Sequence, residues 1–393
     1  MSNQYTPTYH RMWNRDFTLL TIAELLLCIA CYMTIPFLPF RLTTGDNASN
    51  ELASIAVVVF IAGICISGFF GSWLIQHYRR NKVYIVSTTS LGAAILGLSL
   101  FDNQCPIGRE IEVYTLLGVC FVGGAVFGTA KRVLSCTLQI DKTESCNRTH
   151  ANYTAIWISR LTVIVGPILA LLLRDELRGT LFYVVGAAAA VVAALLVMCV
   201  KFPFRAPEEG THLLSIDRFF LPQGWNVALV ITLMTASLGI MMTTRMAIDF
   251  CASILVGFVA ATLLLHFPAV KTARYASVVG CLIATVAILL MLVHDDTFDT
   301  TLKPVLFGLG IAISSSEQLY KLLDHCNHCQ RSTAESTYFL SSDGGLFLGI
   351  AVGWLLSTAL KPAEHVVLAL LVVATIICLL NMLVKKKRAE YHA

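Results

Sequence analysis

Charged side chains are scarce in this sequence, and that scarcity excludes an ordinary soluble fold. Asp, Glu, Lys and Arg together make up 13% of the 393 residues, whereas soluble domains average about 25%. Hydrophobic residues make up 56%, and the mean hydropathy is +0.74. No soluble fold needs so much apolar surface, so the composition predicts many membrane helices rather than a single anchor.

Motifs for several other functions are missing too. The sequence has no Walker A pattern, so we do not expect this chain to drive transport by hydrolysing ATP. The first apolar run is too long for the core of a signal peptide, and no small-residue cleavage pattern follows it. The 13 cysteines lie mostly inside apolar runs, where cysteine behaves as a small hydrophobe, so we expect no disulfide framework.

Metal binding is poorly supported by the sequence. Residues 325–329 read HCNHC, and histidine and cysteine are the usual zinc ligands. Five consecutive residues, however, lack the separation between ligand pairs that zinc sites use. This loop is also the only polar cluster that could suggest an enzyme. We therefore expect no metal, no cofactor and no enzymatic activity.

Twelve apolar runs follow one another along the chain. A hydrocarbon core about 30 Å thick needs roughly 20 helical residues to cross it, so the runs predict an all-α polytopic membrane protein with about twelve transmembrane helices. The turn at 243–246 is so short that one broken element, giving eleven spans, stays an alternative. The runs cover residues 17–40, 52–75, 83–101, 112–134, 153–173, 180–200, 225–242, 247–267, 275–293, 304–323, 333–358 and 364–384.

A polar interval near the middle divides the runs into two sets of six. Residues 201–224 contain three prolines and several charged residues, as is typical of a linker. Basic residues also precede an aromatic residue before both the third and the ninth run. We therefore expect two parallel six-helix bundles. The predicted units are an N-terminal cytoplasmic segment (1–16), the two bundles (17–200 and 225–384), a cytoplasmic linker (201–224) and a basic cytoplasmic tail (385–393).

Positive charge is distributed unevenly between the two sides that this topology defines. With twelve spans, 20 Lys and Arg residues lie on the side of the termini and 7 on the other, while Arg160 lies inside a span. Cytoplasmic loops collect Lys and Arg, so both termini should be cytoplasmic. This bias explains the net charge of +4, which therefore does not indicate nucleic-acid binding. We expect a cell-membrane protein, in the inner membrane if the source is bacterial.

Short motifs occur at comparable places in the helices. They are Pro36 and Pro39 in the first run, Gly71 ahead of Arg79 and Arg80 after the second, and Gly166 and Pro167 in the fifth. With six spans, a linker and six spans, these motifs resemble the major facilitator superfamily (MFS). The paired prolines and the Gly-Pro pair resemble those of its twelve-helix drug/proton antiporters.

The motifs are degenerate, which limits what the resemblance implies. Ile75 or Gln76 stands where the family has an acid, so the usual gating ion pair of that loop does not carry over. Cys120 stands where the family often has an arginine on the fourth helix, so the proton-relay role of that arginine does not carry over either.

The resemblance implies a secondary transporter. Two bundles would rock about a central site, with the first, fourth, seventh and tenth helices lining the cavity. Proton-coupled export of a small organic molecule is the leading interpretation. Protons are expected because the buried ionisable residues are mainly carboxylates, and export because of the proline motifs in the first and fifth runs. Uptake by the same fold, and a polytopic membrane enzyme or sensor, are the alternatives. The expected partners are the substrate, protons and the lipid bilayer, and we expect a monomer because one chain contains both halves.

Glu24 and Arg160 are the first candidate site residues. An acid inside a span costs about 2.5 kcal/mol or more on insertion scales and marks function by default. Glu24 and Arg160 each lie seven residues into their runs, and the first and fifth helices are neighbours in the MFS fold. The acid is therefore either a proton carrier or substrate contact, or the locked partner of Arg160.

Two further acids complete the candidates. Glu317 follows three serines in the tenth run, and four consecutive polar residues cannot all face lipid. We expect it in the cavity or at a gate. Asp343 precedes a stripe of glycines at 345, 349 and 353 in the eleventh run. That spacing predicts close helix packing, and Asp343 is either a pairing site or structural.

Overall fold

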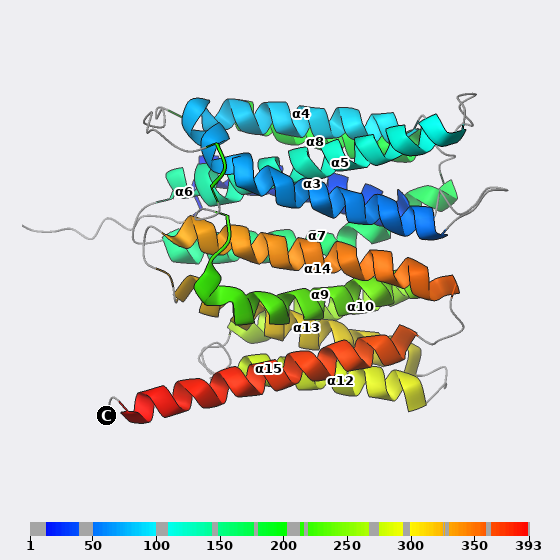
Figure 1. Cartoon of the computed structure of the whole chain (residues 1–393), viewed down its shortest axis with the longest axis vertical. Coiled ribbons are helices and arrows are strands. Elements are labelled where there is room, and N and C mark those ends of the chain that lie inside the picture. Colours follow the sequence, from blue (N-terminus) through cyan, green and yellow to red (C-terminus); the bar gives the residue numbers. More distant parts are fainter. Residues whose placement is uncertain are drawn as a thin grey trace, which may run out of the picture.

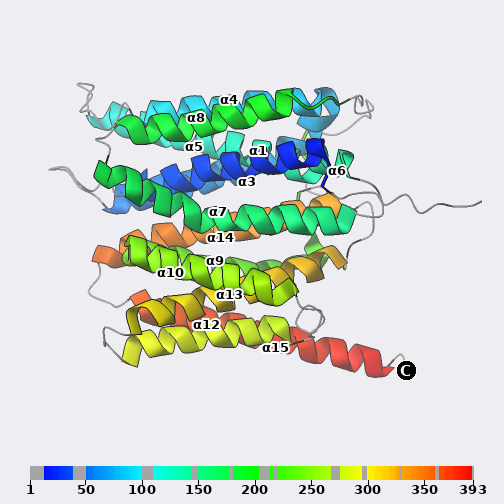
Figure 2. The ribbon, with the colours of Figure 1, turned by 180° about the vertical axis from the view of Figure 1, so that it is seen from behind.

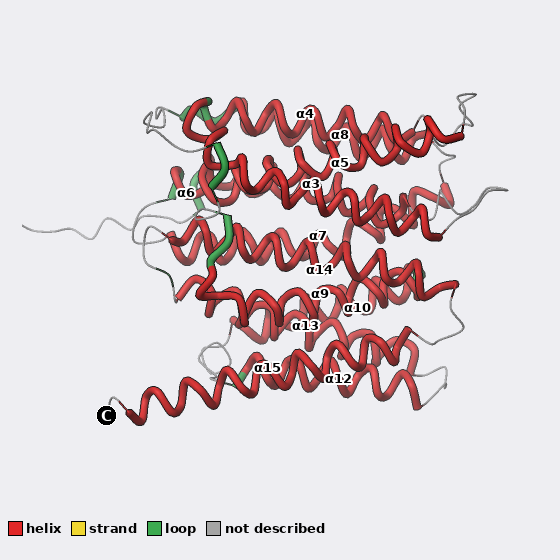
Figure 3. The backbone as a smooth tube through the Cα atoms, viewed as in Figure 1, coloured by secondary structure: helices red, strands yellow, loops and turns green. Residues whose placement is uncertain are grey.

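The computed structural model describes twelve segments of the chain and contains only helices and connecting loops within them (Figure 3). The described residues are 13–38, 50–99, 109–143, 148–176, 180–202, 213–215, 219–266, 275–293, 299–324, 326, 330–358 and 363–391.

Twelve long helices make up almost all of the described chain. They are α1 (Arg15–Thr34), α3 (Asn50–His77), α4 (Arg80–Ser99), α5 (Arg109–Val133), α7 (Arg148–Glu176), α8 (Thr180–Met198), α9 (Trp225–Thr244), α10 (Ile248–His266), α12 (Ala276–Val293), α13 (Asp299–Asp324), α14 (Arg331–Thr358) and α15 (Ala363–Tyr391). Short turns η1 (Ile35–Phe37) and η3 (Pro222–Gly224) flank α1 and α9. α15 runs on through the basic residues 385–388, which were expected in a tail.

Eleven of these helices are long and apolar enough to cross a membrane. The exception is α13, where three consecutive serines, Glu317 and Gln318 lower the hydropathy. Those three serines and Gln318 are buried in the protein, so α13 is shielded from lipid there by its neighbours. α9 and α10 are separate helices, because Arg245 ends α9 before α10 begins at Ile248. The twelve-helix prediction is therefore confirmed over the eleven-helix alternative.

The helices form two bundles with the same internal packing. In the first, α3 packs on α5, α4 on α8, α1 on α7 and α8, and α4 on α5. The corresponding pairs in the second are α10 on α13, α12 on α15, α9 on α14 and α15, and α12 on α13. Figure 1 shows the first bundle above the second, with α7 of the first and α14 of the second where the two bundles meet. The predicted pair of six-helix bundles is confirmed.

The largest contacts between the bundles are those of α3 with α14 and of α7 with α10, and α7 also touches α13. α1 begins, and α15 ends, on the same side of the molecule (Figure 2). We call this side the terminal face and the other the opposite face. On the terminal face, Asn14 donates a hydrogen bond from Nδ2 to the Lys142 carbonyl oxygen at 3.0 Å, and Lys142 Nζ lies 2.7 Å from Asp16 Oδ2.

The fourth membrane helix is longer than the sequence predicted. α5 continues without a break through a π-helical turn, η2 (Leu134–Leu138), into α6 (Gln139–Asp141). Lys131 and Arg132 therefore lie inside the helix and are buried, with 2% and 8% of their surface exposed. Both residues had been counted among the 20 basic residues of the cytoplasmic side, although the predicted run 112–134 contains them, and that count was wrong because they are buried in the bundle. Without them the charge bias becomes 18 against 7 and keeps its sign.

Glycines bring the central helices into close contact. A Cβ on Gly349 would lie 2.1 Å from the carbonyl oxygen of Ala236, so α14 and α9 touch backbone to backbone. Gly345 packs on Thr232 and Gly353 on Thr243 in the same way. The packing role predicted for this stripe is confirmed. Gly166 does the same for α7, where a Cβ would lie 2.8 Å from Tyr32 of α1.

Candidate functional site

Asp343 lies at the centre of a buried ion cluster between the bundles. Its Oδ2 is 2.5 Å from Lys131 Nζ on α5, and its Oδ1 is 3.2 Å from Arg160 Nη1 on α7. Arg160 Nη1 also donates to Ser342 Oγ at 3.0 Å. All three charged side chains are at most 4% exposed. One carboxylate from the second bundle therefore holds two cations from the first.

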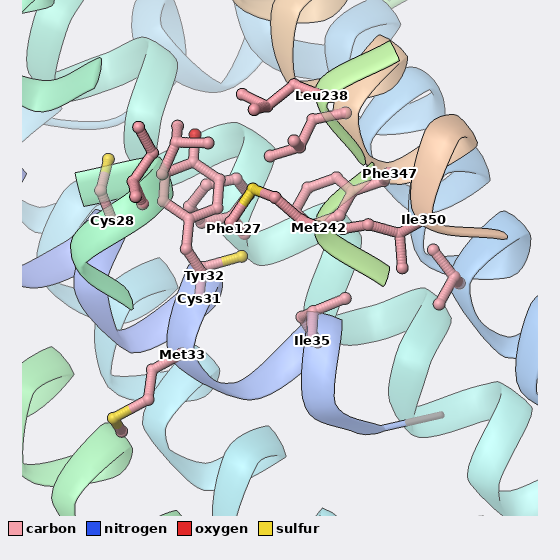
Figure 4. Close-up of a cluster of buried hydrophobic side chains, with 14 of the residues drawn as sticks. Cys28, Cys31, Tyr32, Met33, Ile35, Phe127, Leu238, Met242, Phe347 and Ile350 are labelled. Carbon is pink, nitrogen blue, oxygen red and sulfur yellow. The ribbon is translucent and has the colours of Figure 1, made fainter. Parts of the chain in front are cut away.

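Tyr32 of α1 completes the cluster. Its hydroxyl donates to Asp343 Oδ1 at 2.7 Å and accepts from Lys131 Nζ at 2.9 Å. Figure 4 shows its ring surrounded by apolar side chains, including Phe127, Met242 and Phe347. Helices of both bundles contribute to this layer, whose side chains are packed together. The ion cluster therefore has an aromatic wall on one side.

Arg160 and Asp343 occupy equivalent positions in the two bundles. α7 and α14 occupy corresponding places in the two bundles, since they pack on α1 and α9 respectively. Arg160 and Asp343 each lie twelve residues after the first residue of their helix, about 18 Å along the axis. Two equivalent positions thus carry opposite charges and meet near the middle of the molecule.

Glu24 is held by uncharged donors closer to the terminal face. Its side chain is fully buried, and its carboxylate accepts from Ser135 Oγ at 3.0 Å and from Gln139 Nε2 at 2.7 Å. Both donors belong to η2 and α6. In a regular α-helix, residues eight apart differ by about 80° around the axis. The wider π turn reduces that offset, so Lys131, Ser135 and Gln139 all lie on the side of Glu24.

The ion pair between Glu24 and Arg160, one of the two alternatives for Glu24, is not formed. Arg160 binds Asp343 instead, and within the described residues no basic side chain makes an ion pair with Glu24. The expected pair rested on the equal depth of Glu24 and Arg160 in the first bundle. Asp343, on α14 of the second bundle, reaches the same depth and binds Arg160 instead. Glu24 and Arg160 nevertheless belong to one connected region, linked through α5.

Arg132 extends the charged region along α5. It donates to Ser67 Oγ, and from Nη1 to the Ile64 carbonyl oxygen at 3.3 Å, both on α3. Its guanidinium lies 5.4 Å from the centre of the Phe219 ring. Gly71, a predicted motif position, faces the same guanidinium, with its added Cβ 4.0 Å from Arg132 Nε. The motif glycine therefore lies beside a cation that the sequence did not place in the bundle.

The two motif arginines do not enter the buried cluster. Arg80 Nη1 lies 2.9 Å from Asp141 Oδ2 at the terminal face, with 25% and 36% of the two side chains exposed. Arg79 is exposed between α3 and α4. Arg80 thus ties the start of α4 to the end of α6, which is a surface contact.

The remaining acids lie at the terminal face. Glu317 is 3.5 Å from Lys321 on its own helix α13, and its side chain is 14% exposed. Its neighbour Ser316 bonds the Tyr153 hydroxyl across the two bundles. Glu335 of α14 is fully buried and bonds the thiol of Cys136 in η2. The structure therefore brings Glu317 to the bundle interface but not into the ion cluster.

The prolines meet near the opposite face. Pro36 and Pro167, with Met242, Thr243 and Met246, line a small apolar crevice with room for about one water molecule. α7 changes direction along its length in Figures 1 and 2, as a proline inside a helix causes. Pro39 lies outside the described residues, as do all of residues 325–329 except Cys326.

Charge is divided between the bundles. The buried charged residues of α1, α5 and α7 are Glu24, Lys131, Arg132 and Arg160, which give a formal charge of +2, and those of α14 are Glu335 and Asp343, which give −2. The two faces are therefore complementary, and buried ions of opposite sign hold them together on the terminal side.

Sequence reasoning missed six buried residues of this region: Tyr32, Lys131, Arg132, Ser135, Gln139 and Glu335. A signal was present. Polar residues recur four apart at 131, 135 and 139, and most positions between them, such as Val133, Leu134 and Leu138, are apolar, so the helical pattern continues to Asp141. The charges of Lys131 and Arg132 hid this continuation.

Two helical bundles joined around a buried charged site define a transporter that works by alternating access rather than an enzyme. A model of the Major Facilitator Superfamily matches residues 20–349. The chain belongs to the Major Facilitator Superfamily, and the resemblance inferred from its motifs is confirmed.

Solved structures agree in fold. A bacterial homologue of the iron transporter ferroportin, crystallised in the outward-facing state, is 16% identical with a TM-score of 0.67, over 93% of this chain and 99% of that one. The POT family transporter PepTSo is 11% identical with a TM-score of 0.69, over 97% and 99%. At these identities the likeness shows the fold alone. No curated protein matches the chain.

Proposed function

We propose that this transporter couples export of a small organic molecule to protons, and that Glu24 carries the proton. The observation that supports the proposal is the environment of Glu24, a fully buried carboxylate held by two uncharged donors. A carboxylate without an ion-pair partner can take up a proton without breaking a buried pair. Arg160, which would have prevented this, is bound to Asp343.

The position of Glu24 suits coupling to the bundle motion. Ser135 lies within the π-helical segment and Gln139 follows it directly, and Cys136 in the same segment bonds Glu335 of the second bundle. Protonation of Glu24 changes how α5 is held at the terminal face. Because α5 also carries Lys131, that change reaches the contact with Asp343.

Export as the direction rests on the motifs. Pro36 of η1 and the Gly166–Pro167 pair of α7 resemble those of drug/proton antiporters, and both prolines line the crevice near the opposite face. We further propose that both termini are cytoplasmic, in a cell membrane, and that the chain works as a monomer. The charge bias between the faces supports the orientation.

The test is flux in reconstituted vesicles. Cells that produce the protein are screened for altered sensitivity to a panel of organic compounds, and the compounds that score are used as probes. Wild type should accumulate them under an imposed pH gradient, in the direction opposite to proton flow. Glu24→Gln should lose gradient-driven accumulation by at least about tenfold, as removal of a coupling group does, but keep exchange of probe across the membrane.

The matched control is Glu51→Gln, which removes an exposed acid at the start of α3 and should transport as wild type does. Gradient-driven accumulation that persists in Glu24→Gln would show that Glu24 is not the proton carrier. Probe movement in the same direction as protons would replace export with uptake by symport.

A further inference from the structure

We propose that Lys131 and Arg160 form a carboxylate-binding subsite for the transported molecule, and that Asp343 fills this subsite when no substrate is present. The inference rests on the transport function proposed above. It adds the chemical class of the substrate, an organic acid with a carboxylate and an apolar body.

The geometry at Asp343 is that of a bound carboxylate. One oxygen faces Lys131 at 2.5 Å, and the other faces Arg160 at 3.2 Å and the Tyr32 hydroxyl at 2.7 Å. Each cation thus takes a separate oxygen of one planar group, which is how two donors share a carboxylate. Any free carboxylate that reaches this position finds the same donors.

The cations and the carboxylate can separate because they belong to different bundles. Lys131, Arg160 and Tyr32 all belong to the first bundle, whereas Asp343 comes from the second. Alternating access moves the bundles apart, so Asp343 withdraws with α14 when the terminal face opens. Two cations are then left without their shared counter-ion, which is unfavourable in a site of low polarity. A substrate carboxylate restores the missing charge.

The sign of the charge favours an acid over an amine. The buried groups of α1, α5 and α7 carry a formal +2, so the open first bundle attracts anions and repels cations. A cationic substrate would have to bind Asp343 in place of Lys131. The Lys131 ammonium is held there by further contacts, since its Nζ lies 4.6 Å from the Phe339 ring centre and donates to the Tyr32 hydroxyl.

The apolar side chains beside the subsite determine the kind of body that the substrate carries. The Tyr32 ring packs with Phe127 and Phe347 at centroid distances of 6.2 and 6.0 Å, and Met242 lies beside them (Figure 4). These surfaces are apolar and come from both bundles. A carboxylate joined to an aromatic or aliphatic body would place its charge at the cations and its body against this layer.

The first experiment removes the resident carboxylate and supplies a free one. Purified Asp343→Ala is titrated with acetate, acetamide or inorganic phosphate, and the unfolding temperature is followed. Acetate should raise Tm in a saturable way, while acetamide should not. The Lys131→Met/Asp343→Ala variant should lose the response, whereas Lys131→Arg/Asp343→Ala should keep it. If Asp343→Ala is unfolded without ligand, the yield of monodisperse protein purified in acetate or in acetamide becomes the readout.

The outcomes are decisive. Equal effects of acetate and acetamide, or a response that survives loss of Lys131, would overturn the subsite. A response to phosphate but not to acetate would replace the carboxylate by a phosphate group and overturn the proposed class.

The second experiment uses the wild-type protein and a panel of monocarboxylates, each with its matching amide and amine. Stabilising compounds should be confined to the acids, and their effect should disappear in Lys131→Met and in Arg160→Met. A panel without an active acid, or with active amines or amides only, would overturn the substrate class. Neither experiment uses a pH gradient, so failure here leaves the coupling test of Glu24→Gln standing, and failure of that test leaves acid binding standing.

Discussion

At the scale of single residues, the contribution of an ion pair to stability depends on whether the pair is buried or exposed. Lys131 and Asp343 are almost fully buried, and the removal of one partner leaves the other as an uncompensated ion. Lys142 and Asp16 are also 2.7 Å apart, but their side chains are 19% and 36% exposed. Water already solvates that surface pair, so its geometry contributes little.

These two pairs give a direct comparison. Lys131→Met should lower the free energy of unfolding by about 3–5 kcal/mol, because Asp343 loses its shortest contact. Lys142→Met should lower it by about 0–1 kcal/mol. Unfolding in detergent, titrated with a denaturing surfactant, measures both. Lys131→Met/Asp343→Met should recover part of the loss. Equal effects of the two single changes would mean that the buried pair is solvated.

At the scale of elements, the sequence predicted most helices but not the one that organises the site. Hydrophobic run length was sufficient for the twelve spans, because the membrane fixes helix length. It failed at the end of α5, where the charges of Lys131 and Arg132 look like the start of a loop. Lys131 is neutralised by Asp343 of α14, and Arg132 donates to uncharged oxygens of α3. Asp343 is 212 residues away from Lys131. No local pattern encodes such a pairing, and the same limit produced the wrong partner for Arg160.

The contact of α9 with α14 offers a matched pair of neighbouring glycines. A Cβ on Gly345 would lie 2.6 Å from the Thr232 carbonyl oxygen, whereas a Cβ on Gly344 meets nothing within 4 Å. Gly345→Ala should therefore separate the helices and lower the stability, while Gly344→Ala should raise it by up to about 1 kcal/mol through helix propensity. Thermal unfolding of the two variants checks this. A loss of stability in Gly344→Ala equal to that in Gly345→Ala would contradict the close packing.

The linker is a second element with a defined place at the terminal face. Phe219 packs on Gly68 of α3 and on the Arg132 guanidinium, and the Leu221 amide donates to Thr337 Oγ1 of α14 at 2.8 Å. Two residues of the connection thus contact the bundles, Phe219 the first and Leu221 the second. The predicted interval at 201–224 acts here as a brace rather than as a free spacer.

At the scale of the whole molecule, this conformation is closed at the terminal face. An apolar cluster of Cys136 and Ile156 from the first bundle with Leu319, Leu323 and Tyr338 from the second fills the space between them. The ion cluster lies behind it and joins the same bundles. Both layers must separate for the site to open to that face, so the charges at Asp343 set the balance between closed and open states.

Cys136 reports this balance without any engineered probe. Asp343→Asn keeps the side-chain volume but removes the charge that holds Lys131 and Arg160, so the open state should be more populated. Alkylation of Cys136, 6% exposed in the closed state, should then be about tenfold faster, which corresponds to about 1.4 kcal/mol in the equilibrium. Peptide mapping by mass spectrometry resolves each cysteine. Cys281, buried among helices of the second bundle, should stay protected in both proteins, and exposed Cys199 should react equally in both. An unchanged rate at Cys136 would show that the ion cluster does not hold the terminal face closed, and a parallel rise at Cys281 would show general loosening instead of opening between the bundles.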